Sequence, residues 1–310
     1  MHRSDELCNK ISWLSEDSPL EVAMTRGAAG SNKPSQHGRS LRGDIAVVPR
    51  SSLHAAQSAL SIVSWNVLSV VWESTGGYGT VANCDASPTN SCRRAQVAEW
   101  CLAMRPDVLC LQEVDAVHFS DLADALPGYA GLLQGDDKPH RRDHDKQPCY
   151  CAVFWKVDAF GTELAWAMHR SRTLTVALKW CGRLLYVANV HLYGGPSQHA
   201  VETRARQMDN VLMNIQRHHR NDQHPCVVVA GDFNASADCA LHHALRTMPW
   251  HGIRLTSAYE HPGAASTTPA SIGCYCAPDC RGFVDHVYYS NLRLDAVMEP
   301  IEDDHDRTLL

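Results

Sequence analysis

The sequence has no apolar run long enough to cross a membrane. Its longest apolar stretch, residues 59–72, contains Asn66, whereas a spanning helix needs about 20 consecutive apolar residues. Four acidic side chains within the first twenty residues argue against a secretory or organellar leader. We therefore expect a cytoplasmic or nuclear protein that has no membrane partner.

A general excess of positive charge is also missing. The 310 residues include 28 Lys and Arg against 34 Asp and Glu, which gives a formal net charge of −6. A polyanionic partner would therefore have to be held by a local basic patch or through a metal ion. This balance does not exclude a nucleic-acid substrate, but it gives such a substrate no support.

The cysteines lack the regular pairing of a disulfide framework. Their total of 13 is odd, and several lie in apolar settings, such as Cys110 in LCLQ and Cys226 in CVVVAG. Both features favour free thiols in an intracellular protein. Cys274, Cys276 and Cys280 are spaced C-x-C-x3-C rather than C-x2-C, so they favour loop thiols over a zinc site.

Residues 1–57 lack sustained periodicity and include the polar stretch GAAGSNKPSQHGRS. They are interpreted as an N-terminal extension that is mostly disordered, and residues 58–310 as one folded domain. In that domain, short β-branched runs typical of buried strands alternate with helical spacing at 93–104, 198–220 and 241–248. The segment 198–220 is expected to bury one apolar face, made of Val201, Ala205, Met208, Leu212 and Ile215. The whole pattern predicts an α/β fold, a four-layer α/β sandwich of two mixed β-sheets flanked by helices.

Four of the apolar runs end on a polar residue. SIVSW ends at Asn66, VLCLQ at Glu113, LLYVANV at His191 and CVVVAG at Asp232. Side chains placed just past strand ends can converge on one rim of an α/β fold, where enzymes gather their catalytic groups. The recurrence therefore favours a metal-dependent enzyme.

The segment GDFNA carries the most specific of these signals. Asp232 and Asn234 are two residues apart, so they project to the same side if the backbone stays extended. The carboxylate can hold a hard cation or an attacking water, and the neutral amide can bind a phosphate oxygen without repelling it. An Asx-turn that merely ends a strand explains the same residues equally well.

Glu113 follows an apolar strand that Pro106 and Asp107 introduce. Magnesium is usually bound through one or two carboxylates plus waters and substrate phosphates, so one well-placed glutamate can found a site. The amide of Asn66 could orient Glu113 or touch the metal. Taken singly, Glu113 could also be a solvated strand-end charge and Asn66 a turn residue.

Histidines and acids recur in the C-terminal half. His191 could donate to a phosphate oxygen as charge develops in a transition state, or could be a satisfied core histidine. The dipeptides Asp285-His286 and Asp304-His305 place acids beside imidazoles. Neighbours in a strand point to opposite faces, so the expected catalytic pair is Asp285 with His305, across the fold.

Taken together, six motifs resemble those of the endonuclease/exonuclease/phosphatase superfamily, in that family's order and over about residues 61–310. The motifs are WNVLS, PDVLCLQEVD, ANVHL, AGDFNA, FVDHVYYS and DDH. The resemblance implies hydrolysis of a phosphoric ester by water with a metal ion, Mg2+ or Mn2+ in its place. The resemblance implies that Glu113, Asn66 and Asp304 lie at the metal ion, and that Asp232 orients or activates the attacking water. It implies that Asn234 and His191 bind the scissile phosphate. It also implies that His305, held by Asp285, acts as general base or transition-state stabiliser.

Within the superfamily, LCLQEVD, GYAG and CYCAVFWK look most like the deadenylase and nocturnin branch. That likeness favours RNA over DNA as substrate, cleaved from its 3′ end, and names no protein partner. A nucleotide phosphatase, a tyrosyl-DNA phosphodiesterase or DNA endonuclease activity, and an inactive binding relative remain alternatives. The basic residues that could contact substrate phosphates are Arg141 and Arg142, with Lys138 and His140 in the same loop and Arg204 and Arg206 on the long helix.

Overall fold

The computed structural model describes residues 20–26, 59–67, 69, 90–135, 149–219, 224–260 and 284–297. These residues form two sheets of six strands each, in the orders β12-β1-β2-β3-β5-β4 and β10-β11-β9-β8-β7-β6. The first sheet contains β1 (Leu20–Arg26), β2 (Ala59–Asn66), β3 (Val108–Val114), β4 (Tyr129–Leu133), β5 (Tyr150–Lys156) and β12 (Leu292–Val297). The second contains β6 (Trp166–Arg170), β7 (Thr173–Trp180), β8 (Arg183–His191), β9 (Cys226–Asp232), β10 (Thr256–Ser257) and β11 (Asp285–Ser290).

Both sheets mix parallel and antiparallel pairs. In the first, β12, β1, β2 and β3 run parallel, whereas β5 is antiparallel to both of its neighbours. In the second, β8 and β9 are the parallel pair, and β11 and β7 flank them in the antiparallel sense. The β7–β8 hairpin turns at Gly182.

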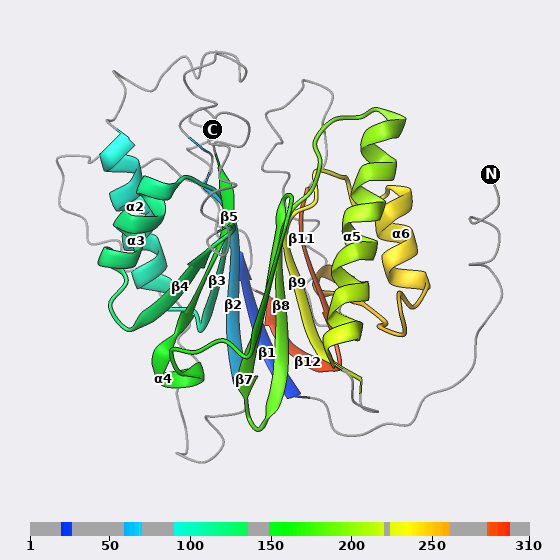
Figure 1. Ribbon diagram of the computed structural model, residues 1–310. Coiled ribbons are helices and arrows are strands. Elements are labelled where there is room, and N and C mark those ends of the chain that lie inside the picture. The colour runs from blue at the N-terminus through cyan, green and yellow to red at the C-terminus, as the bar shows by residue number, and fades with distance from the viewer. Residues whose placement is uncertain are drawn as a thin grey trace.

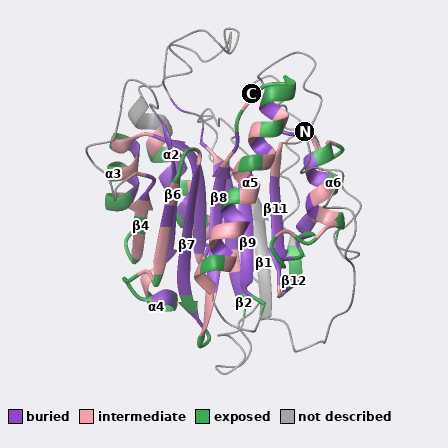
Figure 2. Cartoon of the chain, turned by 45° about the vertical axis from the view of Figure 1, so that its right-hand side comes forward, coloured by how far each residue is buried: buried purple, intermediate pink, exposed green. Residues whose placement is uncertain are grey.

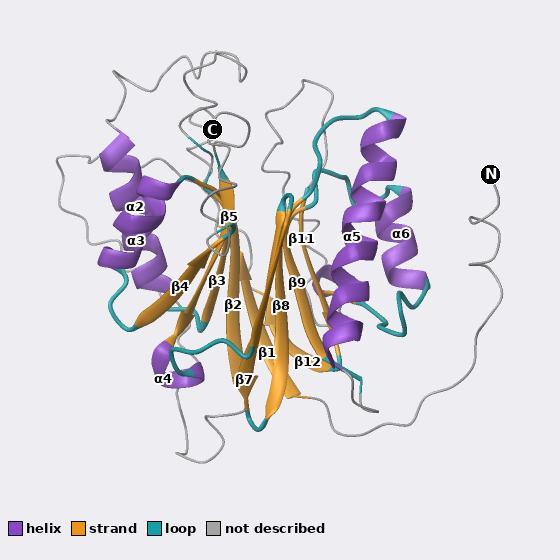
Figure 3. Cartoon of the chain, in the orientation of Figure 1, coloured by secondary structure: helices purple, strands orange, loops and turns teal. Residues whose placement is uncertain are grey.

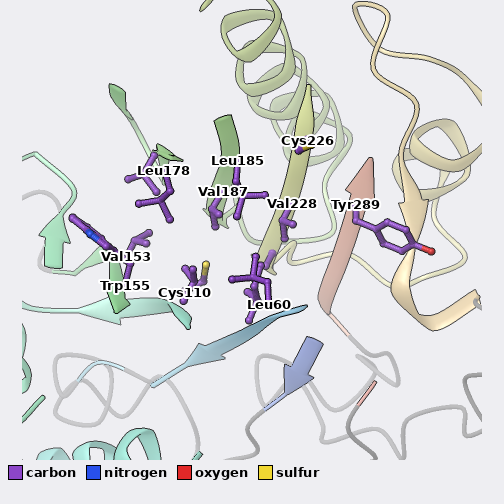
Figure 4. Packing of buried hydrophobic residues seen from close by; sticks show 14 of the residues in the cluster. Leu60, Cys110, Val153, Trp155, Leu178, Leu185, Val187, Cys226, Val228 and Tyr289 are labelled. Atoms are coloured by element: carbon purple, nitrogen blue, oxygen red, sulfur yellow. The ribbon is translucent and has the colours of Figure 1, made fainter. Parts of the chain in front are cut away.

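Strand alternation divides the apolar residues between two faces of each sheet. In β9, Cys226, Val228 and Ala230 face the first sheet, whereas Val227 and Val229 face the helices on the other side. The inner faces of the two sheets pack against each other, with Leu60 and Cys110 directed toward Val228 (Figure 4). The molecule therefore has one core between the sheets and one more under each helical layer.

Helices cover the outer faces (Figures 1 and 3). The helices α2 (Asn90–Met104) and α3 (Ala116–Ala125) pack on the first sheet, and α5 (Gln198–His219) and α6 (Ala240–Thr247) pack on the second. Two short helical turns, α4 (Val157–Phe160) and η3 (Ala258–Glu260), complete the described elements. Figure 2 shows the burial that results, with the strands buried and the outward faces of the helices exposed. The predicted four-layer α/β sandwich is confirmed.

The buried face of α5 differs from the predicted one. Val201 and Ala205 are only half-buried, and the fully buried stripe is Ala200, Arg204, Met208, Val211, Leu212 and Ile215. The apolar pattern misplaces the first two turns because Arg204, a charged residue, lies inside. Its Nη1 donates to the carbonyls of Tyr193 and Gly195, both at 2.9 Å, so a buried guanidinium takes the place of an apolar residue.

The strand β1 lies within residues 1–57, the segment interpreted as an extension. It pairs with β2 on one side and β12 on the other, so part of that segment belongs to the first sheet. Its sequence LEVAMTR places Leu20, Val22 and Met24 at alternate positions, which is the signal that could have identified it. The other residues of 1–57 lie outside the described ranges, and the boundary at residue 58 stays a prediction.

Within the described ranges, no helix is both long and apolar enough to cross a membrane. Among the described residues, Cys101, Cys110, Cys151, Cys226 and Cys239 are free thiols, as expected. Burial raises the pKa of the Cys101 and Cys110 thiols to about 12, so these two are inert packing groups. The loop cysteines 274, 276 and 280 lie outside the described residues.

Candidate active site

Strand ends from both sheets converge at one edge of the sandwich. Asn66 ends β2 and Glu113 lies near the end of β3, in the first sheet; His191 ends β8 and Asp232 ends β9, in the second. His191 and Asp232 are direct partners across the parallel pair. The four residues that the sequence places at run ends therefore meet in one site.

The amide of Asn66 joins the two carboxylates. Its Nδ2 donates to Glu113 Oε1 at 3.1 Å and to Asp232 Oδ2 at 3.0 Å, which is a bond between the two sheets. The other Glu113 oxygen accepts from the backbone N–H of Ser69 at 2.8 Å. Since both carboxylates are largely buried, these donors orient them and offset part of the cost of holding two negative charges together.

Glu113 lies in a strained stretch of backbone. Its φ is 63°, in the left-handed region, and the pairing of β3 with β5 shifts register between Leu111 and Val114. A β-bulge of this kind re-aims a side chain that regular alternation would turn elsewhere. Both faces of β3 are covered, so Gln112 and Glu113 are buried, as is the rest of the strand.

Below the site, a buried amide pair ties the sheets together. Gln112 Nε2 donates to Asn189 Oδ1 at 2.7 Å, and Asn189 Nδ2 donates to the carbonyls of Leu111 and Ala152, both at 2.8 Å. Gln112 precedes Glu113, and Asn189 lies two residues before His191 in β8. The contact therefore sets the separation of the two sheets directly beneath the candidate site.

His191 faces both carboxylates. Its Nε2 lies 3.7 Å from Glu113 Oε1 and 3.8 Å from Asp232 Oδ2. Burial lowers the pKa of His191 to about 4, the Glu113 carboxylate acts in the opposite sense, and the charge of Arg172 lowers it further. The imidazole is therefore neutral at physiological pH and can donate one N–H to a substrate oxygen.

The turn after β9 fixes Asn234. Its backbone N–H donates to Asp232 Oδ1 at 2.7 Å, and its Nδ2 donates to the Leu192 carbonyl at 2.9 Å. Its φ of 48° ends the extended conformation, so simple alternation does not describe the pair. Asn234 stays beside Asp232 through an Asx-turn, which combines the two interpretations that the sequence left open.

Asp285 begins β11 and is the direct partner of Asp232 across the antiparallel pair. The backbone N–H of Phe233 donates to the carbonyl of Val284 at 2.8 Å, which anchors the Asp232–Asn234 turn to the same strand. Asp285 is therefore at the site edge, as the sequence predicts. Its proposed partner His305 lies outside the described residues, as do Asp304, Arg141, Arg142, Lys138 and His140.

Arg172 is a site residue that the sequence reasoning missed. It lies in the turn between β6 and β7, with a φ of 65°, and its carbonyl accepts from the backbone N–H of His191 at 2.9 Å. Its guanidinium carbon lies 5.6 Å from the ring centroid of Tyr193, which is 39% exposed. A basic residue in a short turn before a strand was the available signal, but nothing local shows that the turn reaches His191.

The basic residues on α5 do not form one surface. Arg204 is buried and holds the loop after His191, so the expectation that it contacts a phosphate backbone is wrong. Arg206 is exposed and donates to Thr203 Oγ1 at 3.1 Å. The loop that follows His191 is fixed further by Gln207, which accepts from the backbone N–H of Tyr193 at 2.9 Å.

The donor set suits a hard divalent cation. Glu113 and Asp232 offer carboxylate oxygens, and the Asn66 amide nitrogen points at them as a donor, so Asn66 orients the carboxylates. Among the described residues, no group of three or more His, Cys, Asp or Glu side chains forms a metal cage. Magnesium does not need such a cage, because waters and substrate phosphates complete its shell.

Comparison with known proteins points to one family. The model of the Endonuclease/Exonuclease/phosphatase family matches residues 63–304, a range that includes every residue of the site described above. Members of this family are hydrolases that act on phosphoric esters, and they are generally dependent on divalent metals.

Individual relatives are distant. Nocturnin of Mus musculus is 26% identical over 263 residues, which cover 78% of this chain and 58% of that protein. A probable CCR4-Not complex 3'-5'-exoribonuclease subunit Ccr4 of Vairimorpha ceranae is 21% identical over 262 residues, 69% of this chain and 52% of that one. The chain thus spans little more than half the length of these relatives. Their similarity places it in the nocturnin and Ccr4 branch.

A solved structure agrees in fold. That of ANGEL2, described as a 2',3'-cyclic phosphatase, has a TM-score of 0.59 and 19% identity over 74% of this chain and 82% of its own. At this identity, the likeness shows the fold alone.

Proposed function

Because the chain belongs to the Endonuclease/Exonuclease/phosphatase family, we propose that it is a Mg2+-dependent phosphodiesterase that hydrolyses nucleic acid. The preferred substrate is single-stranded RNA, degraded from its 3′ end. One observation carries this proposal: Asn66, Glu113 and Asp232 come from both sheets and join in one hydrogen-bonded group beside His191. A purely structural protein has no use for two adjoining buried carboxylates at a strand edge.

The metal requirement is part of the proposal. Glu113 and Asp232 would hold Mg2+, or Mn2+ in its place, while Asn66 keeps their oxygens directed at the ion. Asp304 would lie near the same ion. The bound cation would neutralise charge on the phosphate and polarise its oxygens.

The chain's own groups then carry the hydrolysis. Asp232 orients the attacking water, while the neutral N–H of His191 and the side chain of Asn234 bind the oxygens of the scissile phosphate. Arg172, whose charge acts on His191, stabilises the negative charge that develops on those oxygens. His305, held by Asp285, serves as general base or transition-state stabiliser.

The substrate choice rests on the relatives and on charge. The relative named as a probable 3'-5'-exoribonuclease subunit favours RNA. A chain with net charge −6 has no general attraction for polyanions. We therefore propose that a local basic patch, which includes Arg141 and Arg142, binds the RNA phosphates beyond the scissile one.

Product analysis tests the proposal. The protein is incubated with Mg2+ and end-labelled single-stranded RNA, DNA of the same sequence, or a phosphorylated dinucleotide, with EDTA controls. We expect RNA shortening from the 3′ end that EDTA abolishes. Release of inorganic phosphate from the dinucleotide, with no cleavage of RNA, would replace the proposal by the nucleotide phosphatase alternative. No hydrolysis of any substrate would favour an inactive binding relative.

A further inference from the structure

Two buried histidines lie behind the turn that carries Asp232 and Asn234. His242 comes from α6 and His286 from β11, and both are almost fully buried. The Nε2 atoms of both imidazoles lie 3.2 Å from the same carbonyl oxygen, that of Ala235. Their ring centroids are 3.9 Å apart. Two elements far apart in sequence thus meet on one backbone atom next to Asn234.

The hydrogen-bond partners fix the protonation of this pair. A carbonyl oxygen only accepts, so Nε2 carries the hydrogen in both rings. Nδ1 of His242 lies 2.6 Å from the hydroxyl of Tyr288, and in the neutral ring it accepts from that O–H. A continuous chain of bonds therefore runs from Tyr288 through His242 to Ala235.

The pair also holds the side chain between the two site residues. The ring of Phe233 is fully buried and lies 5.1 Å from that of His242 and 5.6 Å from that of His286, as centroid distances. Phe233 is thus fixed on the side away from the site. Its neighbours Asp232 and Asn234 are directed to the opposite side, toward Glu113 and Leu192.

Burying two imidazoles behind a loop is costly unless both are hydrogen-bonded. Apolar residues would fill the same space, as they do elsewhere under α6, where Leu241 and Leu245 pack. The two imidazoles add a directional constraint that apolar residues lack, because two donors aimed at the Ala235 carbonyl restrict the plane of the peptide between Ala235 and Ser236, one residue beyond Asn234. Asn234 has a φ of 48°, in the left-handed region, which asparagine adopts more readily than most residues other than glycine.

We propose that His242 and His286 are positioning residues of the active site, which hold Ala235 and Phe233 so that Asn234 and Asp232 keep their orientation toward the substrate. The inference rests on the proposed function, because it assigns a role in catalysis. It adds Tyr288 as the residue that fixes the tautomer of His242.

Substitutions at His242 separate donation from packing. His242→Leu fills the space but cannot donate to Ala235, whereas His242→Gln retains an N–H near the position of Nε2. We expect His242→Leu to lower kcat/KM for end-labelled RNA with Mg2+ by about 10- to 100-fold. His242→Gln should recover most of that loss. Equal losses in both variants would overturn a role for the donated hydrogen bond.

A double-mutant cycle tests whether His242 acts through the turn. In an Asn234→Ala background, one of the two positioned groups is absent, so the loss caused by His242→Leu should be clearly smaller than in the wild-type background. A loss of the same size in both backgrounds would show that the histidine acts on folding alone. All variants are assayed well below their melting temperatures, measured by circular dichroism.

The chain supplies a matched control for Tyr288. Tyr186, also buried in the second sheet, pairs its hydroxyl with His218 Nδ1 at 2.9 Å, away from the turn. Tyr288→Phe should lower activity several-fold and alter the 15N shifts of the His242 ring in the full-length protein. Tyr186→Phe should leave activity unchanged. Equal behaviour of the two variants would contradict the proposal even if His242→Leu fails to fold.

The failures are distinguishable. If the wild-type protein does not hydrolyse RNA with Mg2+, the proposed function itself fails, and if Glu113→Gln and Asn234→Ala retain full hydrolysis, the assignment of the site fails. If those variants lose most of their activity but His242→Leu is neutral, or additive with the residual activity of Asn234→Ala, only the positioning role fails.

Discussion

At the scale of single residues, Glu113 combines three features that a strand residue with a purely structural role does not need. It is buried, it carries a carboxylate, and its left-handed φ of 63° costs about 1 to 2 kcal/mol relative to an ordinary strand conformation. Its partners are donors only, Asn66 and the backbone of Ser69. Backbone strain and a buried charge at the same position are typical of a functional residue, because neither of them stabilises the fold.

Glu113→Gln should therefore separate activity from stability. The substitution keeps the size of the side chain but removes the charge, so we expect kcat to fall on the order of 1,000-fold, the equivalent of several kcal/mol. The melting temperature should change by only a few degrees. The control is Glu99→Gln on the exposed face of α2, which should alter neither quantity. Turnover in Glu113→Gln that matches this control would remove Glu113 from the site.

His242 gives the protein a component of pH-dependent stability. Burial lowers the pKa of His242 from 6.5 to about 4 in the folded state. In the unfolded chain, His242 therefore binds a proton at a higher pH than in the folded protein. Its contribution to the free energy of unfolding is fully present above pH 6.5 and is lost as the pH falls toward 4. Of the charges that act on the ring, Arg246 and Arg204 lower its pKa and Asp238 raises it; all three stay charged across most of this range.

We expect the melting temperature of His242→Gln to fall less steeply between pH 6.5 and 4.5 than that of the wild type. His243→Gln is the control, because its imidazole is exposed on the same helix. Thermal melts at several pH values measure both. A wild-type slope in His242→Gln would show that the buried imidazole does not take part in acid unfolding.

At the scale of elements, the site depends on how closely β8 and β9 approach. Gly231 has a φ of 145°, and a Cβ at this position would lie 1.9 Å from the carbonyl oxygen of Val190. Only glycine permits this approach, which brings His191 and Asp232 opposite each other. The glycine that precedes Asp232 in the sequence is therefore part of the site's construction.

Gly231→Ala should destabilise the fold by about 2 to 4 kcal/mol, because both the positive φ and the clash with backbone atoms oppose it. The matched control is Gly182→Ala in the β7–β8 hairpin, where φ is 76° but nothing lies within 4 Å of the added Cβ. That variant should cost only about 1 kcal/mol, from backbone strain. Urea unfolding measures both, and equal losses would show that the close approach of the strands is unimportant.

The elements that sequence reasoning found are those whose signal is local. Asn66, Glu113, His191 and Asp232 were identified because each stops a buried apolar run, and buried strands need such runs. Arg172, His242 and His286 were not assigned to the site, since their importance arises from contacts across the fold. The short strands β4 and β6 are only partly buried and lack the continuous apolar runs of β3 and β9, so their local signal is weak.

At the scale of the whole molecule, the two sheets are not independent supports. The Asn66 amide and the Gln112–Asn189 pair both cross from one sheet to the other near the site. Any change in the packing of one sheet on the other therefore moves Glu113 relative to Asp232. The strand β1 matters in this respect, since it separates β12 from β2, the strand that carries Asn66.

Removal of β1 should therefore affect both stability and activity. A chain that starts at residue 30 loses all of β1 and leaves β2 paired with β3 alone, so the backbone groups of β2 and β12 that face β1 lose their partners. A chain that starts at residue 20 retains the strand. We expect the shorter chain to melt at least about 5 °C lower than the longer one, which corresponds to roughly 2 kcal/mol in a domain of this size. RNA hydrolysis should fall in parallel, because Asn66 loses its support. If both truncated chains melt and hydrolyse alike, β1 adds nothing to the domain, and the interpretation of residues 1–57 as a dispensable extension holds.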